Sequence, residues 1–124
     1  MGWAPAKGRR RTIQAAWEDE DLVAAVVATG RKKLIIAALR TEVCLVFPAL
    51  DAMQTGFEVY AVVDAVAGIS EDAHRTGLGR IMQAGAKPVS LVQLACELLR
   101  DWNREETAAR FAGIGFTEVG EFRK

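Results

Sequence analysis

Apolar and polar positions along the chain follow helical and extended periods in turn, with a glycine after each helical segment. The segment WEDEDLVAAVVATG (17–30) has apolar residues at helical spacing, acidic residues near its start and Gly30 at its end. Acidic side chains favour a helix N-terminus and glycine favours the position after a helix, so this segment is predicted to be a helix. The following KKLIIAAL (32–39) is apolar without alternation, which predicts a strand buried on both faces.

The same order of helix, glycine and strand continues along the chain. Two further helices are predicted at 41–56 and 70–85, and two further strands at 57–65 and 87–92. A fourth helix is predicted at 93–106. The glycines that end the first three helices are about thirty residues apart, which is the size of a βαβ unit. Helices that alternate with fully apolar strands predict an α/β fold with a parallel sheet and right-handed crossovers.

The fourth helix carries its large apolar residues at helical spacing. Leu94, Leu98 and Trp102 share one face, which predicts that this helix packs on the sheet. Cys96 on the same helix is also predicted to pack against the sheet. No structure is assigned to the glycine-rich end of the chain, FAGIGFTEVGEFRK.

The composition is that of one small globular domain. The chain has 124 residues, 51% of them hydrophobic and 26% charged, and its sixteen basic residues balance sixteen acidic ones. No net charge therefore favours nucleic acid or an anionic membrane as a partner. The exception is the basic cluster KGRRR (7–11), which we interpret as a solvated tail, with nucleic-acid contact as the alternative.

The sequence also suggests a compartment. No apolar run approaches the roughly 20 residues of a membrane span, and no apolar stretch follows the N-terminal charges as in a secretory signal. Two cysteines are too few for a disulfide framework, so a reducing, cytoplasmic location is expected. The sequence has one histidine and no Cys-x-x-Cys motif, so neither a zinc site nor another cofactor is expected.

Cys44 is the first candidate for chemistry, because it follows the first predicted strand and active sites of such folds lie at the carboxyl ends of strands. With Thr41 as N-cap, Cys44 is the third helical residue, where backbone N–H groups and the helix dipole favour a thiolate. Pro48 has no N–H to bond the carbonyl of Cys44, which predicts a helix loosened behind the thiol. The alternative is a buried core cysteine, and periodicity leaves both interpretations open.

Residues Thr12–Trp102 resemble the isochorismatase-like cysteine hydrolases, and most closely a bacterial branch of that family. The matching motifs are TEVCLVFPALDA (41–52), GFEVYAVVDAVAGISEDAHRTGL (56–78) and ACELLRDW (95–102). The resemblance implies a three-layer α/β/α hydrolase with a parallel sheet. It also implies a small-molecule substrate, either an amide or a compound with a related C–N or C–O bond.

The resemblance implies an Asp–Lys–Cys constellation in which Cys44 is the nucleophile. It further implies a cis peptide between Leu39 and Arg40, so that the N–H groups of Arg40 and Cys44 form an oxyanion hole. The family's lysine, which is an arginine in some members of this branch, is expected at Arg10, or one residue later at Arg11.

The family's aspartate, its general base, lies on a first strand that has no counterpart before Thr12. The chain is therefore expected to be N-terminally truncated relative to the family. The alternative function is a catalytically impaired remnant that serves as an oligomeric binding protein or a thiol-reactive protein. His74, the only histidine, is expected to be an exposed helical residue rather than a replacement base.

The missing first strands have a structural consequence. Without the neighbouring strand, residues 34–39 form an apolar edge of the sheet, and such edges recruit other strands unless they are covered. Self-association, the C-terminal tail or the N-terminal residues could cover it, and we predict a homo-oligomer. The expected organisation is a basic segment outside the resemblance (1–11), an α/β domain (12–106) and a C-terminal tail (107–124).

Overall fold

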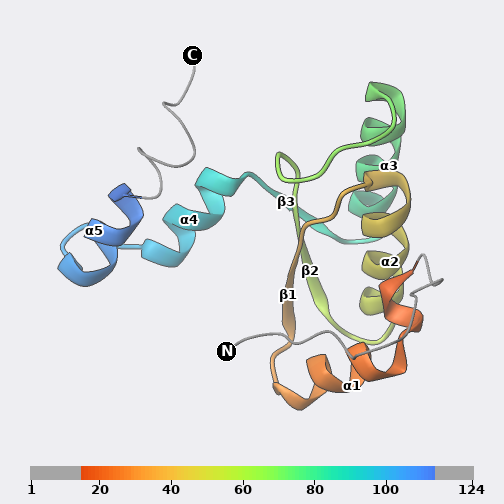
Figure 1. Cartoon of the computed structure of the whole chain (residues 1–124), viewed down its shortest axis with the longest axis horizontal. Helices are drawn as coiled ribbons and strands as arrows, with labels where there is room; N and C mark the ends of the chain where they lie inside the picture. The colour runs from red at the N-terminus through yellow and green to blue at the C-terminus, as the bar shows by residue number, and fades with distance from the viewer. Residues whose placement is uncertain (1–14, 114–124) are drawn as a thin grey trace, which may run out of the picture.

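The computed structural model describes residues 15–113 and confirms the predicted parallel α/β fold. Its elements are a 3₁₀ turn (Ala16–Glu18), α1 (Glu20–Ala28), β1 (Lys33–Ile36), a π-helical turn (Thr41–Leu45), α2 (Val46–Gln54), β2 (Glu58–Val62), α3 (Glu71–Gln83), β3 (Lys87–Val89), α4 (Leu91–Leu99) and α5 (Glu105–Gly113) (Figure 1). We refer to the π-helical turn Thr41–Leu45 as the cysteine turn.

Short polar side chains begin three of the helices, because the first N–H groups of a helix have no partner within it. Asp19 accepts hydrogen bonds at the start of α1, Ser70 accepts one from the Ala73 N–H at the start of α3, and Ser90 does the same for α4. The predicted glycine ends are confirmed, since the residues after α1, α2 and α3 have positive φ angles. They are Gly30 (69°), Gly56 (95°) and Gly85 (112°).

The sheet has the strand order β1-β2-β3, and both pairings are parallel. Ile35 lies opposite Tyr60, and Ala61 lies opposite Pro88. Within residues 15–113, β1 pairs only with β2, so its other side is a free edge. The prediction that this strand lies at a sheet edge is confirmed.

The core lies between one face of the sheet and the neighbouring helices α2 and α3 (Figure 1). Leu45 and Ile81 are fully buried there, and Val59 reaches them from β2. The remaining members of this cluster are small or medium apolar residues: Val46, Ala49, Ala52, Phe57, Ala61, Leu78 and Ala86. Small side chains on α2 let this helix lie close to the sheet.

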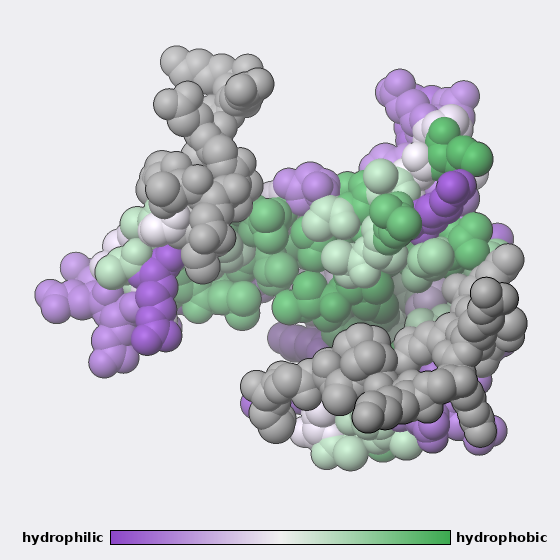
Figure 2. Space-filling model, viewed as in Figure 1, coloured by the Kyte–Doolittle hydropathy of each residue, from purple (hydrophilic) through white to green (hydrophobic). Residues whose placement is uncertain are grey.

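The opposite face of the sheet is largely open. Ile35 is 52% exposed while Leu34 and Ile36 are half-buried, so the prediction that β1 is buried on both faces is wrong. Its apolar sequence suits a strand covered on both sides, and among the described residues only one side is closely packed. A band of apolar residues runs over this region between the sheet and α4 (Figure 2).

The C-terminal helices differ from the prediction. A single helix over 93–106 is wrong, because α4 ends at Leu99, Arg100 has a φ of 62°, and α5 begins at Glu105. The Asp101 carboxylate accepts the Asn103 N–H at 2.9 Å, a local turn that competes with continued helix. Residues 105–113 are helical where the predicted tail had no assigned structure, and residues 114–124 lie outside the described residues.

The packing predicted for the apolar face of α4 is wrong for Leu98 and Trp102, while Leu94 is half-buried beside the sheet. Leu98 is 68% exposed, and Trp102 and Cys96 are exposed as well. Instead of lying flat on the sheet, α4 and α5 extend away from it (Figure 1). Trp102 packs edge-on against Phe111 of α5, with ring centroids 5.3 Å apart.

Candidate active site

The cysteine turn lies at the carboxyl end of the sheet, as predicted. Beyond β1, Arg40 has an extended backbone and makes an isolated parallel bridge with Ala67, which follows the end of β2. The Thr41 N–H donates to the Ala67 carbonyl at 3.0 Å. This bond ties the start of the turn to the loop between β2 and α3, in the region where parallel α/β folds place their ligands.

Cys44 is exposed on this turn, while the next residue, Leu45, is fully buried. The alternative of a buried core cysteine is therefore wrong for Cys44. Its role as a nucleophile stays a prediction, now with a thiol that solvent and small molecules can reach. Cys96 is the other free, exposed cysteine, and it lies on α4.

The turn is wider than the predicted helix start. Arg40, not Thr41, is the residue before the first turn, and the Leu45 N–H donates to the Arg40 carbonyl, five residues back, at 3.2 Å. Regular α-helix begins only at Val46. Pro48 has no N–H for the Cys44 carbonyl, so a regular helical bond is excluded there. The prediction of a loosened helix behind the thiol is confirmed.

The predicted cis peptide is wrong. No cis bond occurs in residues 15–113, so the peptide between Leu39 and Arg40 is trans. The trans form of a non-proline peptide is more stable by about 3 kcal/mol, and the extended Arg40 is held by its bridge to Ala67. The oxyanion hole formed by the N–H groups of Arg40 and Cys44 stays a prediction, and Arg10 lies outside the described residues.

A hydrogen bond between Thr41 and His74 was not predicted. Thr41 is fully buried, and its Oγ1 lies 2.6 Å from Nδ1 of His74 on α3. His74 is half-buried, so the prediction that it is an exposed helical residue is wrong. A usable signal was present, because the segments that follow neighbouring parallel strands meet at the same end of a sheet.

Glu42 is a second residue of the site that sequence reasoning missed. Its Oε1 accepts the Ile69 N–H at 3.0 Å. Hydrogen bonds from its own backbone N–H and from Ile69 lower the pKa of the Glu42 carboxyl, and the nearby charges of Arg40 and His74 act in the same direction. Its Oε2 is buried without a hydrogen-bond partner among the described residues. The ionised carboxylate therefore links the cysteine turn to the loop before α3.

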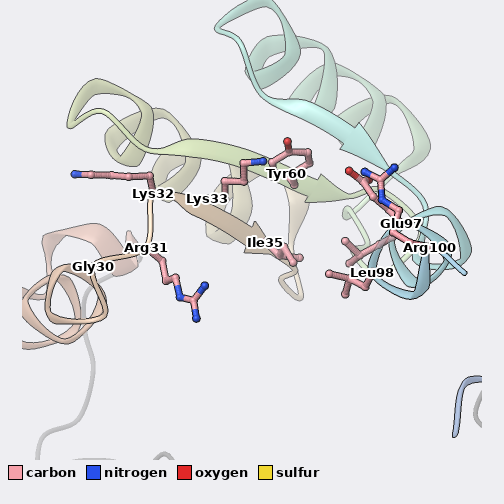
Figure 3. A pocket seen from close by; sticks show the side chains of 10 residues that line it. Gly30, Arg31, Lys32, Lys33, Ile35, Tyr60, Glu97, Leu98 and Arg100 are labelled. Atoms are coloured by element: carbon pink, nitrogen blue, oxygen red, sulfur yellow. The ribbon is translucent and has the colours of Figure 1, made fainter. Parts of the chain in front are cut away.

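A groove lies elsewhere, on the open face of the sheet. It has a volume of about 650 Å³, and its walls come from residues 30–33, Ile35 of β1, Tyr60 of β2 and one side of α4 (Figure 3). Ile35 and Leu98 approach each other across it, and Arg31 and Lys33 bring positive charge to the end near the start of β1 (Figure 3). Cys44 is not among its lining residues, so this groove is separate from the thiol.

Residues 15–113 contain no group of three or more His, Cys, Asp or Glu side chains placed to hold a metal ion. None of the helices between these limits has the length and apolar character to cross a membrane.

Comparison with known proteins gives a consistent result. Residues 9–93 match the model of the isochorismatase domain. The chain is 48% identical over 90 residues to the probable hydrolase YcaC of Escherichia coli K12, a match that covers 73% of this chain and 43% of that protein.

Solved structures show the same likeness. The crystal structure of E. coli YcaC, an octameric hydrolase of unknown specificity, matches with a TM-score of 0.78 and 44% identity, covering 84% of this chain and 52% of that one. YcaC from Pseudomonas aeruginosa, solved with hexane-2,5-diol and covalent acrylamide, has the same TM-score and coverage at 40% identity. The nicotinamidase PncA of Bacillus subtilis has a TM-score of 0.60 and 27% identity, covering 64% of this chain and 44% of that one. The chain spans about half the length of these relatives, or less.

Proposed function

The chain belongs to the isochorismatase family, and from this we propose that it hydrolyses a small amide with Cys44 as the nucleophile. The observation that carries the proposal is the exposed thiol in a turn at the carboxyl end of a parallel strand. Backbone N–H groups of a first helical turn favour an anion, and a thiolate is the reactive form of cysteine. The likeness to the nicotinamidase PncA of B. subtilis supports a small amide as the substrate class.

The proposed reaction has two steps. The Cys44 thiolate attacks the amide carbonyl, the C–N bond breaks, and ammonia leaves with one added proton, so that a thioester remains on the enzyme. Water then attacks the thioester, which releases the carboxylic acid and restores the thiol. Proton transfer to the leaving nitrogen requires a general acid, and no described residue is assigned to this step. The free thiols of Cys44 and Cys96 support the expected reducing, cytoplasmic location.

The proposal is tested with a panel of small primary amides, namely acetamide, propionamide, benzamide and nicotinamide. We expect at least one to release ammonia at a rate proportional to protein concentration, measured in a coupled glutamate dehydrogenase assay. Intact mass spectrometry would detect the thioester or a stable adduct on Cys44. Absence of ammonia release from every amide would refute the hydrolase, and selective labelling of Cys44 in that case would favour the thiol-reactive alternative.

We also propose that the chain forms a homo-oligomer through the free edge of β1 and the open face beside it. Among residues 15–113 no strand pairs with the outer side of β1, and the adjoining face exposes Ile35 and Leu98. A second copy would supply both apolar area and charge complementarity, because the groove is basic at Arg31 and Lys33 while α5 begins with Glu105 and Glu106. The octamer of E. coli YcaC supports the same expectation.

Replacing Ile35 with lysine tests this interface. We expect light scattering to give a multiple of 13.5 kDa for the wild type and a lower mass for Ile35→Lys, because the new charge would have to be buried at the contact. Met82→Lys is the matched control, because Met82 is exposed on α3, away from the open face, and its mass should equal that of the wild type. A monodisperse wild-type monomer would contradict the proposal.

A further inference from the structure

We propose that His74 is a positioning residue that holds the cysteine turn in place through its hydrogen bond to Thr41. The inference rests on the proposed function only in treating Cys44 as the reactive group. It concerns where the thiol is held and how reactive it is, whether or not the chain completes an amide hydrolysis.

The cysteine turn is poorly supported by its own backbone. A regular helix would bond the Cys44 carbonyl to the N–H of residue 48, and Pro48 has none. The backbone bond at the end of the turn spans five residues, from the Leu45 N–H to the Arg40 carbonyl. A turn with a missing helical bond depends on contacts from outside for a single conformation.

Three polar contacts supply that support, and all involve the first two residues of the turn. The Thr41 N–H bonds the Ala67 carbonyl, and the Ile69 N–H bonds the Glu42 carboxylate, so the loop after β2 provides two of them. The third joins Thr41 Oγ1 to His74 Nδ1 at 2.6 Å and is the one that comes from α3. Because Thr41 is fully buried, water cannot replace this partner.

The backbone that carries the imidazole is well held. The His74 backbone N–H donates to the Ser70 carbonyl at 3.0 Å, and the Ser70 hydroxyl caps the same first turn of α3 by accepting the Ala73 N–H at 3.1 Å. A Cβ added at Gly68 would lie only 2.8 Å from the His74 backbone nitrogen. Capping and this close approach leave the base of the His74 side chain little freedom to move.

Close packing couples α3 to the turn. A Cβ added at Gly77 would lie 3.2 Å from Val46 Cγ2 and 3.3 Å from Thr41 Cγ2. The helix therefore approaches the cysteine turn so closely that a Cβ at position 77 would be crowded. A turn released from His74 would lose its polar contact with α3, and the backbone around Cys44 would then be held less firmly.

The test measures the rate constant for alkylation of Cys44 by iodoacetamide at pH 7, in a Cys96→Ser background that leaves one thiol. We expect Thr41→Val and His74→Leu each to slow alkylation about fivefold, the factor that corresponds to one hydrogen bond of about 1 kcal/mol. The double variant should be no slower than either single one, because both remove the same contact. Thr41→Ser and His74→Asn keep a polar atom near the bond and should restore most of the rate.

Thr76→Val is the matched control for the threonine change, because Thr76 is exposed on α3. In this variant Cys44 should be alkylated at the wild-type rate. Circular dichroism checks that each variant is folded, and if Thr41→Val does not fold, the comparison of His74→Leu with His74→Asn decides. Unchanged rates in folded variants, or losses that add in the double variant, would refute the positioning role. If the alkylation rates follow the expected pattern but the wild-type protein hydrolyses no amide, only the proposed hydrolase is refuted.

Discussion

Replacing Cys44 with serine is expected to lower amide hydrolysis by a factor on the order of 10³ or more. A hydroxyl stays protonated at neutral pH, and no described residue is assigned as a base that could activate it. Ammonia release from the best amide of the panel measures the effect. Because Cys44 is exposed, the free energy of unfolding in urea should stay within about 0.5 kcal/mol of the wild-type value.

Cys96→Ser is the matched control for this prediction. It makes the same chemical change at the other exposed free cysteine, on α4, and should leave turnover within about twofold of the wild type. Equal losses in both variants would assign the effect to general thiol chemistry instead of the cysteine turn. Full activity of Cys44→Ser would remove Cys44 from the mechanism.

Local signals predicted most of the secondary structure. Acidic first turns and glycines with positive φ mark helix ends through short-range physics, so α1, α2 and α3 could be located within a few residues. The place of Cys44 followed from the same reasoning, because a thiol just after a parallel strand must lie at the carboxyl end of the sheet. Pro48 also predicted the loosened turn, since the missing N–H is a property of one residue.

Features that depend on distant partners could not be predicted in this way. Ile35 is apolar, but its burial requires a covering layer, and no residue near it in the sequence reports whether that layer is present. Thr41 and His74 are 33 positions apart, and only the crossover from β2 to α3 brings them together. The break at Arg100 has a different cause, because a local turn at Asp101 competed with a helical pattern that continued through it.

Leu45→Ala should cause the largest loss of stability, because Leu45 anchors the cysteine turn in the core. Its side chain is fully buried in the cluster beneath α2 and α3, so truncation removes apolar contacts and leaves a cavity. We expect the free energy of unfolding in urea to fall by about 2–5 kcal/mol. Leu39→Ala, at a position that is 82% exposed, makes the same change and should cost less than about 0.5 kcal/mol.

These unfolding measurements are made at two protein concentrations, so that any stabilisation from self-association is separated from that of the core. Equal losses in both leucine variants at low concentration would contradict the core assignment. In a folded Leu45→Ala protein, alkylation of Cys44 should also slow. The cysteine turn is attached to the core by Leu45 and to α3 by Thr41, and both contacts are needed to hold the thiol in place. An unchanged alkylation rate would show that the contacts of Thr41 and Glu42 are sufficient.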